Sequence, residues 1–445
     1  MGRADTVVAI ATATGPAGIG VVRVSGPGVC SLIRGIIGRD LSPRMATLTR
    51  FQDAQGHALD QGIAIYFPAP ASYTGEDVLE LQGHGGPAVL KLVLRRCLEL
   101  GARPAEPGEF TLRAYLNGKL DLAQAESVAD LIHAGSATAA KGAMRSLTGE
   151  FSEKINEFTR LLLDLRVRIE STLDFPEEGL DQIQRSQTRN TLIILQAQLD
   201  VILKSAEQGR LLKDGVRLVL VGRPNVGKSS LMNRLAGEEL AIVTDVPGTT
   251  RDSLHHECVI EGIPVHLSDT AGLRQSVDPV EKLGIERAWR ETKLADIGLM
   301  VMDSATGITF EDRKIIAELP KELKLIFVFN KIDTIGEKPE MLYGNAGMEV
   351  KVSAKTGAGL DDLRQTILQT IGWDRSEEVH YLGRERHLDA LRGAARSVTM
   401  ALNQTQLDLL AEELRLAQNA LSTITGEFSS EDLLGEIFAR FCIGK

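Results

Sequence analysis

A glycine-rich motif in the middle of the chain has the residue types and spacing needed to bind a nucleoside triphosphate. The motif G-x-x-x-x-G-K-S begins at Gly222 and ends at Lys228 and Ser229. Its glycines allow backbone N–H groups to converge on a phosphate, and the following helix N-terminus adds partial positive charge. Lys228 can reach the β- and γ-phosphates, and Ser229 can bind Mg²⁺. A predicted strand before the motif and a predicted helix after it favour a phosphate loop over a chance glycine-rich turn.

Three later motifs indicate that the nucleotide is GTP. Asp269-Thr-Ala-Gly272 follows a predicted strand and suits an aspartate near Mg²⁺ with a glycine N–H near the γ-phosphate. In Asn330-Lys-Ile-Asp333, the Asp333 carboxylate can accept hydrogen bonds from guanine N1–H and the 2-amino group. Adenine offers neither donor, so a buried carboxylate would discriminate strongly against it. Ser353-Ala-Lys355 supplies loop N–H groups suited to guanine O6.

Residues 241–252 form a polar, glycine-containing segment that we interpret as a switch ordered by Mg²⁺ and the γ-phosphate, although an ordinary turn-rich loop is the alternative. Thr250 is the predicted second Mg²⁺ ligand beside Ser229. Leu273 occupies the position where Ras-like enzymes carry the glutamine that orients the attacking water. Another group must therefore supply that function, together with the positive charge of an arginine finger.

The predicted GTP contacts come from the phosphate loop, the switch and the three later motifs. They are Asn225, Val226, Gly227, Lys228, Ser229, Ser230, Thr244, Asp245, Val246, Pro247, Gly248, Thr249, Thr250, Asp269, Thr270, Ala271, Gly272, Asn330, Lys331, Asp333, Ser353, Ala354 and Lys355.

Length and composition predict a soluble, cytoplasmic protein of several domains. The chain has 445 residues, enough for about three domains. Its net charge of −10 argues against non-specific nucleic-acid binding over the whole surface. The four cysteines show no metal-ligand spacing, which fits a reducing compartment. No run approaches 18 apolar residues, so we expect no membrane span.

Hydrophobic periodicity divides the chain into four segments. Residues 1–117 alternate short strands and turns, with a helix over 88–100, Glu80 in a strand and His84 in a glycine turn. Residues 118–212 and 373–445 have helical periodicity and flank residues 213–372, where strands and helices alternate. We predict one discontinuous helical bundle interrupted by an inserted, doubly wound G domain. The predicted strands cover residues 7–11, 20–24, 62–67, 216–221, 253–260, 263–268, 297–302, 323–329 and 348–352.

The whole chain resembles the MnmE/TrmE tRNA-modification GTPases. The resemblance rests on the order of segments, on Asn225 within the phosphate loop and on Gly-Thr-Thr-Arg-Asp at 248–252. The G-domain motifs are shared with other bacterial GTPases, including the double-G-domain ribosome-assembly family. The segments Tyr73–Asp77, Leu81–Gly86 and Phe441–Lys445 are not. The resemblance implies a Ras-like P-loop G domain and an N-terminal α+β domain that binds folate and mediates dimerisation.

The resemblance also implies a potassium ion beside the phosphates, in the place of an arginine finger. Its ligands would be Asn225, Thr244, Val246 and Thr249. This ion and dimerisation of the G domains would account for Leu273. The family's water-orienting acid falls on Glu281, which the residues alone predict only as an exposed carboxylate at a helix start. The implied catalytic residues are Glu281, Lys228 and Thr250.

The N-terminal domain of this family binds a tetrahydrofolate derivative, the 5,10-methylene or 5-formyl form, as one-carbon donor. The implied contacts are Arg23, Glu80, Lys119 and Lys445. A carboxylate can pair with the amino-pyrimidine edge, and cations can hold the glutamate tail. Without the family, Glu80 is interpreted as a solvent-facing strand residue. Cys442 falls near this pocket, and we interpret it as a buried structural thiol.

The resemblance therefore implies a homodimeric, K⁺-dependent GTPase that acts with an FAD- and NADH-dependent partner of the MnmG/GidA type. The pair would add a carboxymethylaminomethyl or aminomethyl group to C5 of the wobble uridine (U34) of certain tRNAs, while GTP hydrolysis drives G-domain dimerisation. One alternative is a ribosome-assembly GTPase switch, although the acidic C-terminal segment argues against an RNA-binding module there. The other is a folate-dependent one-carbon enzyme with a regulatory G domain.

Overall fold

The computed structural model describes residues 5–174, 182–237, 255–269, 289–344, 347–374, 381–426, 431–439 and 441–444. The chain divides into two compact units. The first comprises Met1–Ile132, Ser146–Leu199 and Ala390–Lys445, and the second comprises His133–Arg145 and Asp200–Asp389. None of the helices in the described ranges is long and apolar enough to cross a membrane. The division of the chain at residues 117, 212 and 372 stays a prediction.

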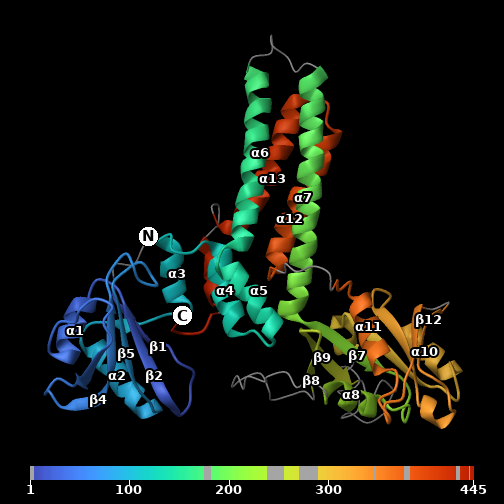
Figure 1. Ribbon diagram of the computed structural model, residues 1–445, viewed down its shortest axis with the longest axis horizontal. Helices are drawn as coiled ribbons and strands as arrows, with labels where there is room; N and C mark the ends of the chain where they lie inside the picture. Colours follow the sequence, from blue (N-terminus) through green and yellow to red (C-terminus); the bar gives the residue numbers. More distant parts are fainter. Residues whose placement is uncertain are drawn as a thin grey trace. The chain divides into compact units, whose positions relative to one another are not determined.

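The first unit begins with a six-stranded sheet in the order β3-β4-β5-β2-β1-β6. Neighbouring strands are antiparallel except for the parallel pair β1 and β6. Helices α1 (Val29–Ile37) and α2 (Pro87–Glu99) cover one face, where they bury strand residues such as Val22 and Leu81 (Figure 1). The strands are β1 (Val7–Ile10), β2 (Ala17–Ser25), β3 (Thr47–Gln52), β4 (Ala58–Phe67), β5 (Val78–Gly85) and β6 (Arg103–Pro104).

We call the face of strands β3, β4, β5 and β2 that lies opposite α1 and α2 the open face. The register places Leu48, Ile63, Gln82 and Val21 in one line across these four strands. Paired residues lie on the same face of a sheet, and their sequence neighbours lie on the other. Since Val22 and Leu81 are buried beneath the helices, this line belongs to the opposite face, where Leu48 and Ile63 are exposed.

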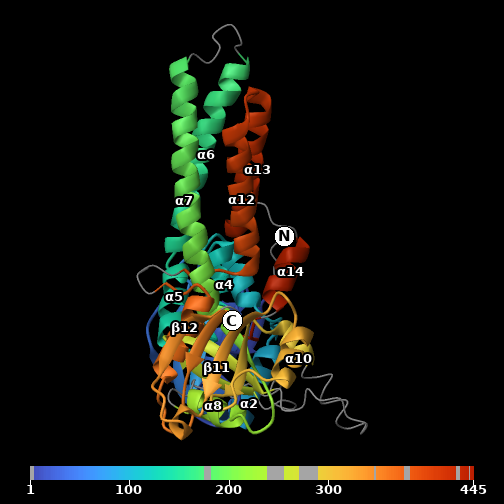
Figure 2. The same cartoon turned by 90° about the vertical axis from the view of Figure 1, so that its right-hand side faces the viewer.

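Helices make up the remainder of the first unit. The apolar stripes of α6 (Glu150–Asp174) and α13 (Leu407–Thr425) pack against each other (Figure 2), so the helical segments before and after the inserted domain form one bundle. Gln196 of α7 donates to Thr399 of α12 across 2.8 Å, which adds a second link between the two segments. The other helices are α3 (Glu109–Leu116), α4 (Leu122–Ile132) and α14 (Glu431–Ala439), while α7 (Gln182–Asp214) and α12 (Glu385–Asn403) continue into the second unit.

The second unit contains a seven-stranded sheet in the order β12-β13-β11-β10-β7-β9-β8. Its five central strands are parallel, and antiparallel strands β12 and β8 form the edges. This confirms the predicted doubly wound G domain. The strands are β7 (Val216–Val221), β8 (His255–Ile260), β9 (Ile263–Asp269), β10 (Ile297–Asp303), β11 (Lys324–Asn330), β12 (Glu340–Gly344) and β13 (Gly347–Lys351), and the helices include α5 (Ala137–Leu147), α8 (Lys228–Ala236), α10 (Phe310–Glu318), α11 (Leu360–Thr370) and the 3₁₀ turn η1 (Ile332–Thr334).

The structure corrects the prediction of a glycine turn at His84. His84 lies within β5, where Gly83 pairs with Gly20 and Gly85 pairs with Ala17. A Cβ atom at Gly85 would lie 2.5 Å from the Ala17 carbonyl oxygen. These glycines therefore permit close approach of two strands, which is the other common reason for glycine in this position. Helices α1 and α3 and strands β3, β6 and β12 were not predicted.

Candidate functional site

The phosphate loop connects β7 to α8, and two of its glycines are required by contacts as well as by conformation. Gly227 has φ = +98°, and a Cβ atom there would lie 2.3 Å from Nδ2 of Asn330. Gly222 has φ = +147°, and its Cβ would lie 2.3 Å from the Val301 carbonyl oxygen. Both φ values are unfavourable for other residues. The loop therefore passes directly against β10 and the end of β11.

Lys228 lies across the phosphate loop that precedes it. Its ammonium group donates to the carbonyl oxygens of Gly222 at 2.8 Å and Arg223 at 3.0 Å. The side chain is buried, while Ser229 and Ser230 are exposed in the first turn of α8. This arrangement holds a cation at the helix N-terminus, where backbone N–H groups are available to phosphate oxygens.

Asn330 joins the phosphate loop to the loop after β13. Its side chain is buried; Nδ2 donates to the Val226 carbonyl at 2.8 Å, and Oδ1 accepts from the Ala354 N–H at 2.9 Å. The Ser353 hydroxyl donates to Oδ1 of Asp333 at 2.6 Å. The structure thus brings together the phosphate loop, Asn330–Asp333 and Ser353–Ala354, as the sequence predicts.

Lys331 is the second link between these motifs. The residue has φ = +68°, and its ammonium group donates to the Asn225 carbonyl at 2.7 Å and to Oδ2 of Asp303 at 2.9 Å. The hydrogen bond from Lys331 lowers the pKa of Asp303 below its usual value. Asp303 ends β10 and was not identified from the sequence, because it belongs to none of the four motifs.

Several predicted residues lie outside the described ranges. They are Thr244–Thr250, Thr270–Gly272, Glu281 and Lys445. Asp269 is the last residue of β9, and its backbone pairs with Leu220 of the strand that leads into the phosphate loop. Of the predicted metal ligands, the structure describes Ser229 and Asn225. Lys355, a predicted GTP contact, is exposed in the loop after β13.

A second cluster of predicted residues lies on the N-terminal sheet. Arg23 of β2 pairs with Glu80 of β5 in register, and its Nη2 and Nε lie 2.8 and 3.0 Å from Oε1 of Glu80. The two side chains are 15% and 18% exposed, so the interpretation of Glu80 as solvent-facing is wrong. The rings of Tyr73 and Phe110 lie 5.3 and 5.8 Å from the guanidinium carbon, within range of a cation–π interaction.

The Arg23 guanidinium retains an unused donor. Its Nη1 atom is buried and has no hydrogen-bond partner among the described residues. Within the described part of the chain, Oε2 of Glu80 has only a long contact, 3.4 Å from Nε2 of Gln82. A buried polar atom without a partner is costly, and a bound polar ligand would satisfy it.

Lys119 and the C-terminal segment lie near other parts of this domain. Lys119 donates to the Pro70 carbonyl at 3.2 Å, at the start of the loop that carries Tyr73. A Cβ atom at Gly444 would lie 2.5 Å from the Ile10 carbonyl, so the end of the described chain packs against β1. Cys442 is exposed, and its interpretation as a buried thiol is wrong.

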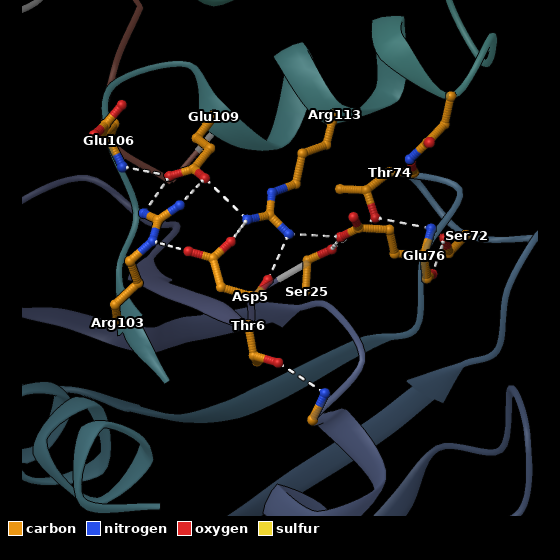
Figure 3. A network of polar contacts seen from close by, with 12 residues as sticks. Asp5, Thr6, Ser25, Ser72, Thr74, Glu76, Arg103, Glu106, Glu109 and Arg113 are labelled. Carbon is orange, nitrogen blue, oxygen red and sulfur yellow. Dashed lines mark hydrogen bonds and ion pairs between the residues drawn. The ribbon is translucent and has the colours of Figure 1, made fainter. Parts of the chain in front are cut away.

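A network of charged side chains centred on Arg113 holds the Tyr73 loop to the sheet (Figure 3). Nη1 of Arg113 lies 2.9 Å from Oε2 of Glu76, and Nη2 lies 2.9 Å from Oδ1 of Asp5 and 3.0 Å from Oε1 of Glu109. The Ser25 hydroxyl also donates to Glu76 at 2.8 Å. Ser25 ends β2 and Arg113 belongs to α3. Glu76 is therefore held by both the sheet and the helix, and this fixes the loop that also carries Tyr73.

The charges of this network favour its ionised form. The hydrogen bond from Arg103 lowers the pKa of Asp5. Burial raises the pKa of Glu109, but hydrogen bonds from Arg103, the Glu106 N–H and Arg113 outweigh it, so the pKa lies below its usual value. The sequence gives no signal for these pairs, since their members are separated by up to 108 positions.

The fold and the first site together define a class of protein: a P-loop G domain carried with a helical bundle and an N-terminal sheet domain. Comparison with known proteins is more specific. The family model "GTP-binding protein TrmE N-terminus" matches residues 6–119, and "MnmE helical domain" matches residues 122–442. The chain therefore belongs to the MnmE family of tRNA modification GTPases.

Relatives span the whole chain. The "tRNA modification GTPase MnmE" of Nitrosomonas europaea is 54% identical over 447 residues and covers 99% of both chains. The protein of the same name from Azoarcus sp. is 55% identical over 446 residues, covering 99% of this chain and 98% of its own. A crystal structure of an Era variant from Aquifex aeolicus bound to GDP.AlF4- is similar over 43% of this chain and 69% of its own, at 26% identity and a TM-score of 0.29.

The Arg113 network makes a prediction about stability. Arg113→Met leaves Glu109, only 6% exposed, with Arg103 as its remaining cation. Because breaking a buried ion pair strands a charge, we expect a loss of about 3 kcal/mol in the free energy of unfolding of this domain. Peptide-resolved hydrogen exchange of β1 and α3 in urea measures it. The control, Arg415→Met, breaks an exposed pair with Glu412 and is expected to leave β1 and α3 unchanged.

The Arg113 network also predicts how the stability of this domain depends on pH. Asp5 and Glu109 have lowered folded pKa values, so their stabilisation is present above the usual values of 3.8 and 4.5 and is lost as pH falls through the folded values. In Arg113→Met, which removes a cation from both carboxylates, protection of β1 and α3 should decline less steeply with acid. Equal acid dependence in the two proteins would contradict this account of the network.

Proposed function

We propose that this chain is a K⁺-dependent GTPase that modifies tRNA together with a flavin-dependent partner of the MnmG/GidA type. The pair would add a carboxymethylaminomethyl or aminomethyl group to C5 of the wobble uridine of certain tRNAs in the cytoplasm, with a tetrahydrofolate one-carbon donor. The observation that carries the GTPase assignment is Asn330, whose side chain ties the phosphate loop to the predicted guanine-binding loop. Membership of the MnmE family extends it to tRNA.

The residues of the G domain have distinct roles in this proposal. The Lys228 ammonium and the N–H groups of the phosphate loop bind the β- and γ-phosphates, and Asp333, oriented by Ser353, binds the guanine. Ser229 and Thr250 would hold Mg²⁺. Asn225, Thr244, Val246 and Thr249 would hold K⁺. Both ions would supply positive charge to the phosphates, and Glu281 would orient the attacking water.

The Arg23 and Glu80 pair has the chemistry expected of a folate site. The buried Nη1 of Arg23, without a partner among the described residues, and the weakly bonded Oε2 of Glu80 offer one donor and one acceptor on the central strands β2 and β5. A carboxylate suits the amino-pyrimidine edge of a pterin, and Lys119 with Lys445 would hold the glutamate tail. The packing of Gly444 against β1 supports a contribution from Lys445.

The open face supports a homodimer. Leu48, Ile63 and Ile19 are exposed apolar residues on strands β3, β4 and β2. Leu48 and Ile63 are paired across the two strands, and adjacent exposed apolar side chains of this kind favour a protein interface. Because Arg23 and Glu80 lie on the same face, pairing of two copies there would also enclose the folate.

Base recognition predicts the effect of Asp333→Asn. The variant loses the charged acceptor for guanine N1–H and the 2-amino group, so we expect the preference for GTP over XTP to fall about 100-fold or more. Competition binding with GTP, XTP and ATP measures it. Ser353→Ala is the matched control, because it removes only the hydroxyl that donates to Asp333 and should cost less. Unchanged discrimination in Asp333→Asn would exclude the base-reading role.

Cation dependence is predicted by Asn225 and by the leucine at position 273. We expect GTP hydrolysis to be at least about tenfold faster in KCl than in NaCl at equal ionic strength, since K⁺ replaces an arginine finger. Asn225→Gly tests the ligand, because glycine adopts the φ of +65° without strain. This variant should bind GDP normally and lose the difference between salts. Equal rates of the unaltered protein in both salts would refute the K⁺ assignment.

The tRNA-modification role is tested in a strain that lacks this protein. Nucleoside analysis of its tRNA should show wobble uridine without the C5 group, restored by the unaltered gene and not by one encoding Arg23→Ala, which removes the cation beside Glu80. Normal wobble modification, together with GTP-dependent co-sedimentation with ribosomes, would instead favour the ribosome-assembly alternative. Turnover of a folate substrate without a partner protein would favour the one-carbon enzyme.

A further inference from the structure

The segment that follows β10 contacts the phosphate loop through the Arg223 side chain. Nε of Arg223 lies 3.1 Å from Oδ1 of Asp312, and Nη2 donates to the Thr306 hydroxyl at 3.1 Å. Arg223 is the second residue of the phosphate loop, directly after Gly222. Neither Thr306 nor Asp312 belongs to a predicted nucleotide motif.

Hydrogen bonds with Thr309 orient the Asp312 side chain. Its side chain is fully buried, and it is the third residue of α10. Oδ2 accepts from the Thr309 N–H at 2.9 Å, and the Asp312 N–H donates to the Thr309 hydroxyl at 3.4 Å, which together form a capping box. The Thr309 hydroxyl also donates to Oδ2 at 2.7 Å. Oδ1 therefore faces Arg223, and a buried carboxylate requires such a cation.

Arg223 also contacts Lys228, the lysine proposed to bind the phosphates. The Arg223 carbonyl accepts from the Lys228 ammonium at 3.0 Å. At the other end of the same segment, Asp303 holds Lys331, which donates to the Asn225 carbonyl. Residues 303–312 thus act on the phosphate loop at two points: directly on the Arg223 side chain and, through Lys331, on the Asn225 carbonyl.

We propose that Asp312 is a positioning residue for GTP binding, acting through Arg223 on the phosphate loop. Gly222 beside Arg223 has a φ of +147°, and glycine has little preference of its own for this conformation, so contacts of the neighbouring Arg223 help to hold the backbone there. The ion pair reduces the conformational freedom that the loop must lose when it closes around phosphates. The inference rests on the proposed GTP binding and adds a residue that does not contact the nucleotide.

The test is Asp312→Asn in the full-length protein. Asparagine keeps the volume and the acceptor for Thr309 but removes the charge that holds Arg223. We expect the Kd for GTP and GDP to rise about tenfold and KM for GTP to rise with it, while kcat at saturating GTP stays within about twofold. Fluorescent GDP titration and steady-state hydrolysis measure these quantities.

The control for helix stability is Thr309→Val. It removes the capping hydroxyl from the same helix end and leaves Arg223 and Asp312 paired. We expect lowered thermal stability with unchanged nucleotide affinity. Equal losses of affinity in Thr309→Val and Asp312→Asn would overturn the proposal, because they would assign the effect to the helix end alone.

Arg223→Gln supplies a test that holds if Asp312→Asn folds poorly. Arg223→Gln should raise the Kd for GDP about as much as Asp312→Asn does. In a double-mutant cycle, the variant that carries both substitutions should bind GDP no more weakly than either single variant. Additive losses would show that the two residues act independently and would overturn the proposal. Failure of the unaltered protein to bind GTP would overturn the proposed function as well, whereas normal affinity in all variants would overturn only the role of Asp312.

Discussion

The close approach of the phosphate loop to Asn330 is the constraint on which the nucleotide site depends. A Cβ atom at Gly227 would lie only 2.3 Å from Nδ2 of Asn330, so any side chain there would push Asn330 away from the phosphate loop. Only at this spacing can Asn330 donate to Val226 and accept from Ala354. One buried amide, at the start of the Asn330–Asp333 motif, therefore joins the phosphate loop to the loop after β13.

The parallel sheet makes this convergence possible. Strands β7, β9, β10 and β11 are parallel neighbours, so their carboxyl ends lie along one edge. The phosphate loop, Asp269, Asp303 and Asn330 each end or follow one of these strands. Each of these strands needs only a short loop to bring its polar residues to the same edge, which is the general location of ligand sites in such folds.

The same geometry explains what could be predicted from the sequence. Motifs at strand ends are local, so residues 222–229, 330–333 and 353–355 were identified, and apolar periodicity placed most strands of the G domain. Edge strand β12 was missed because its residues are mostly exposed and show little alternation. Arg113 and Asp312 were missed for a different reason: their roles depend on partners 37 and 89 positions away, and no local pattern records such a pair.

The two sites solve one physical problem in the same way. Each relies on a loop containing glycine, Tyr73–Asp77 on the sheet domain and Gly222–Ser229 in the G domain, and glycine has little conformational preference of its own. In each, a charged side chain on a neighbouring helix pairs with the loop: Arg113 with Glu76, and Asp312 with Arg223. Burial makes these pairs expensive to break, so the helix imposes one conformation on the loop. Glycine supplies the space that the ligand or neighbouring backbone needs, and the ion pair supplies the order that glycine lacks.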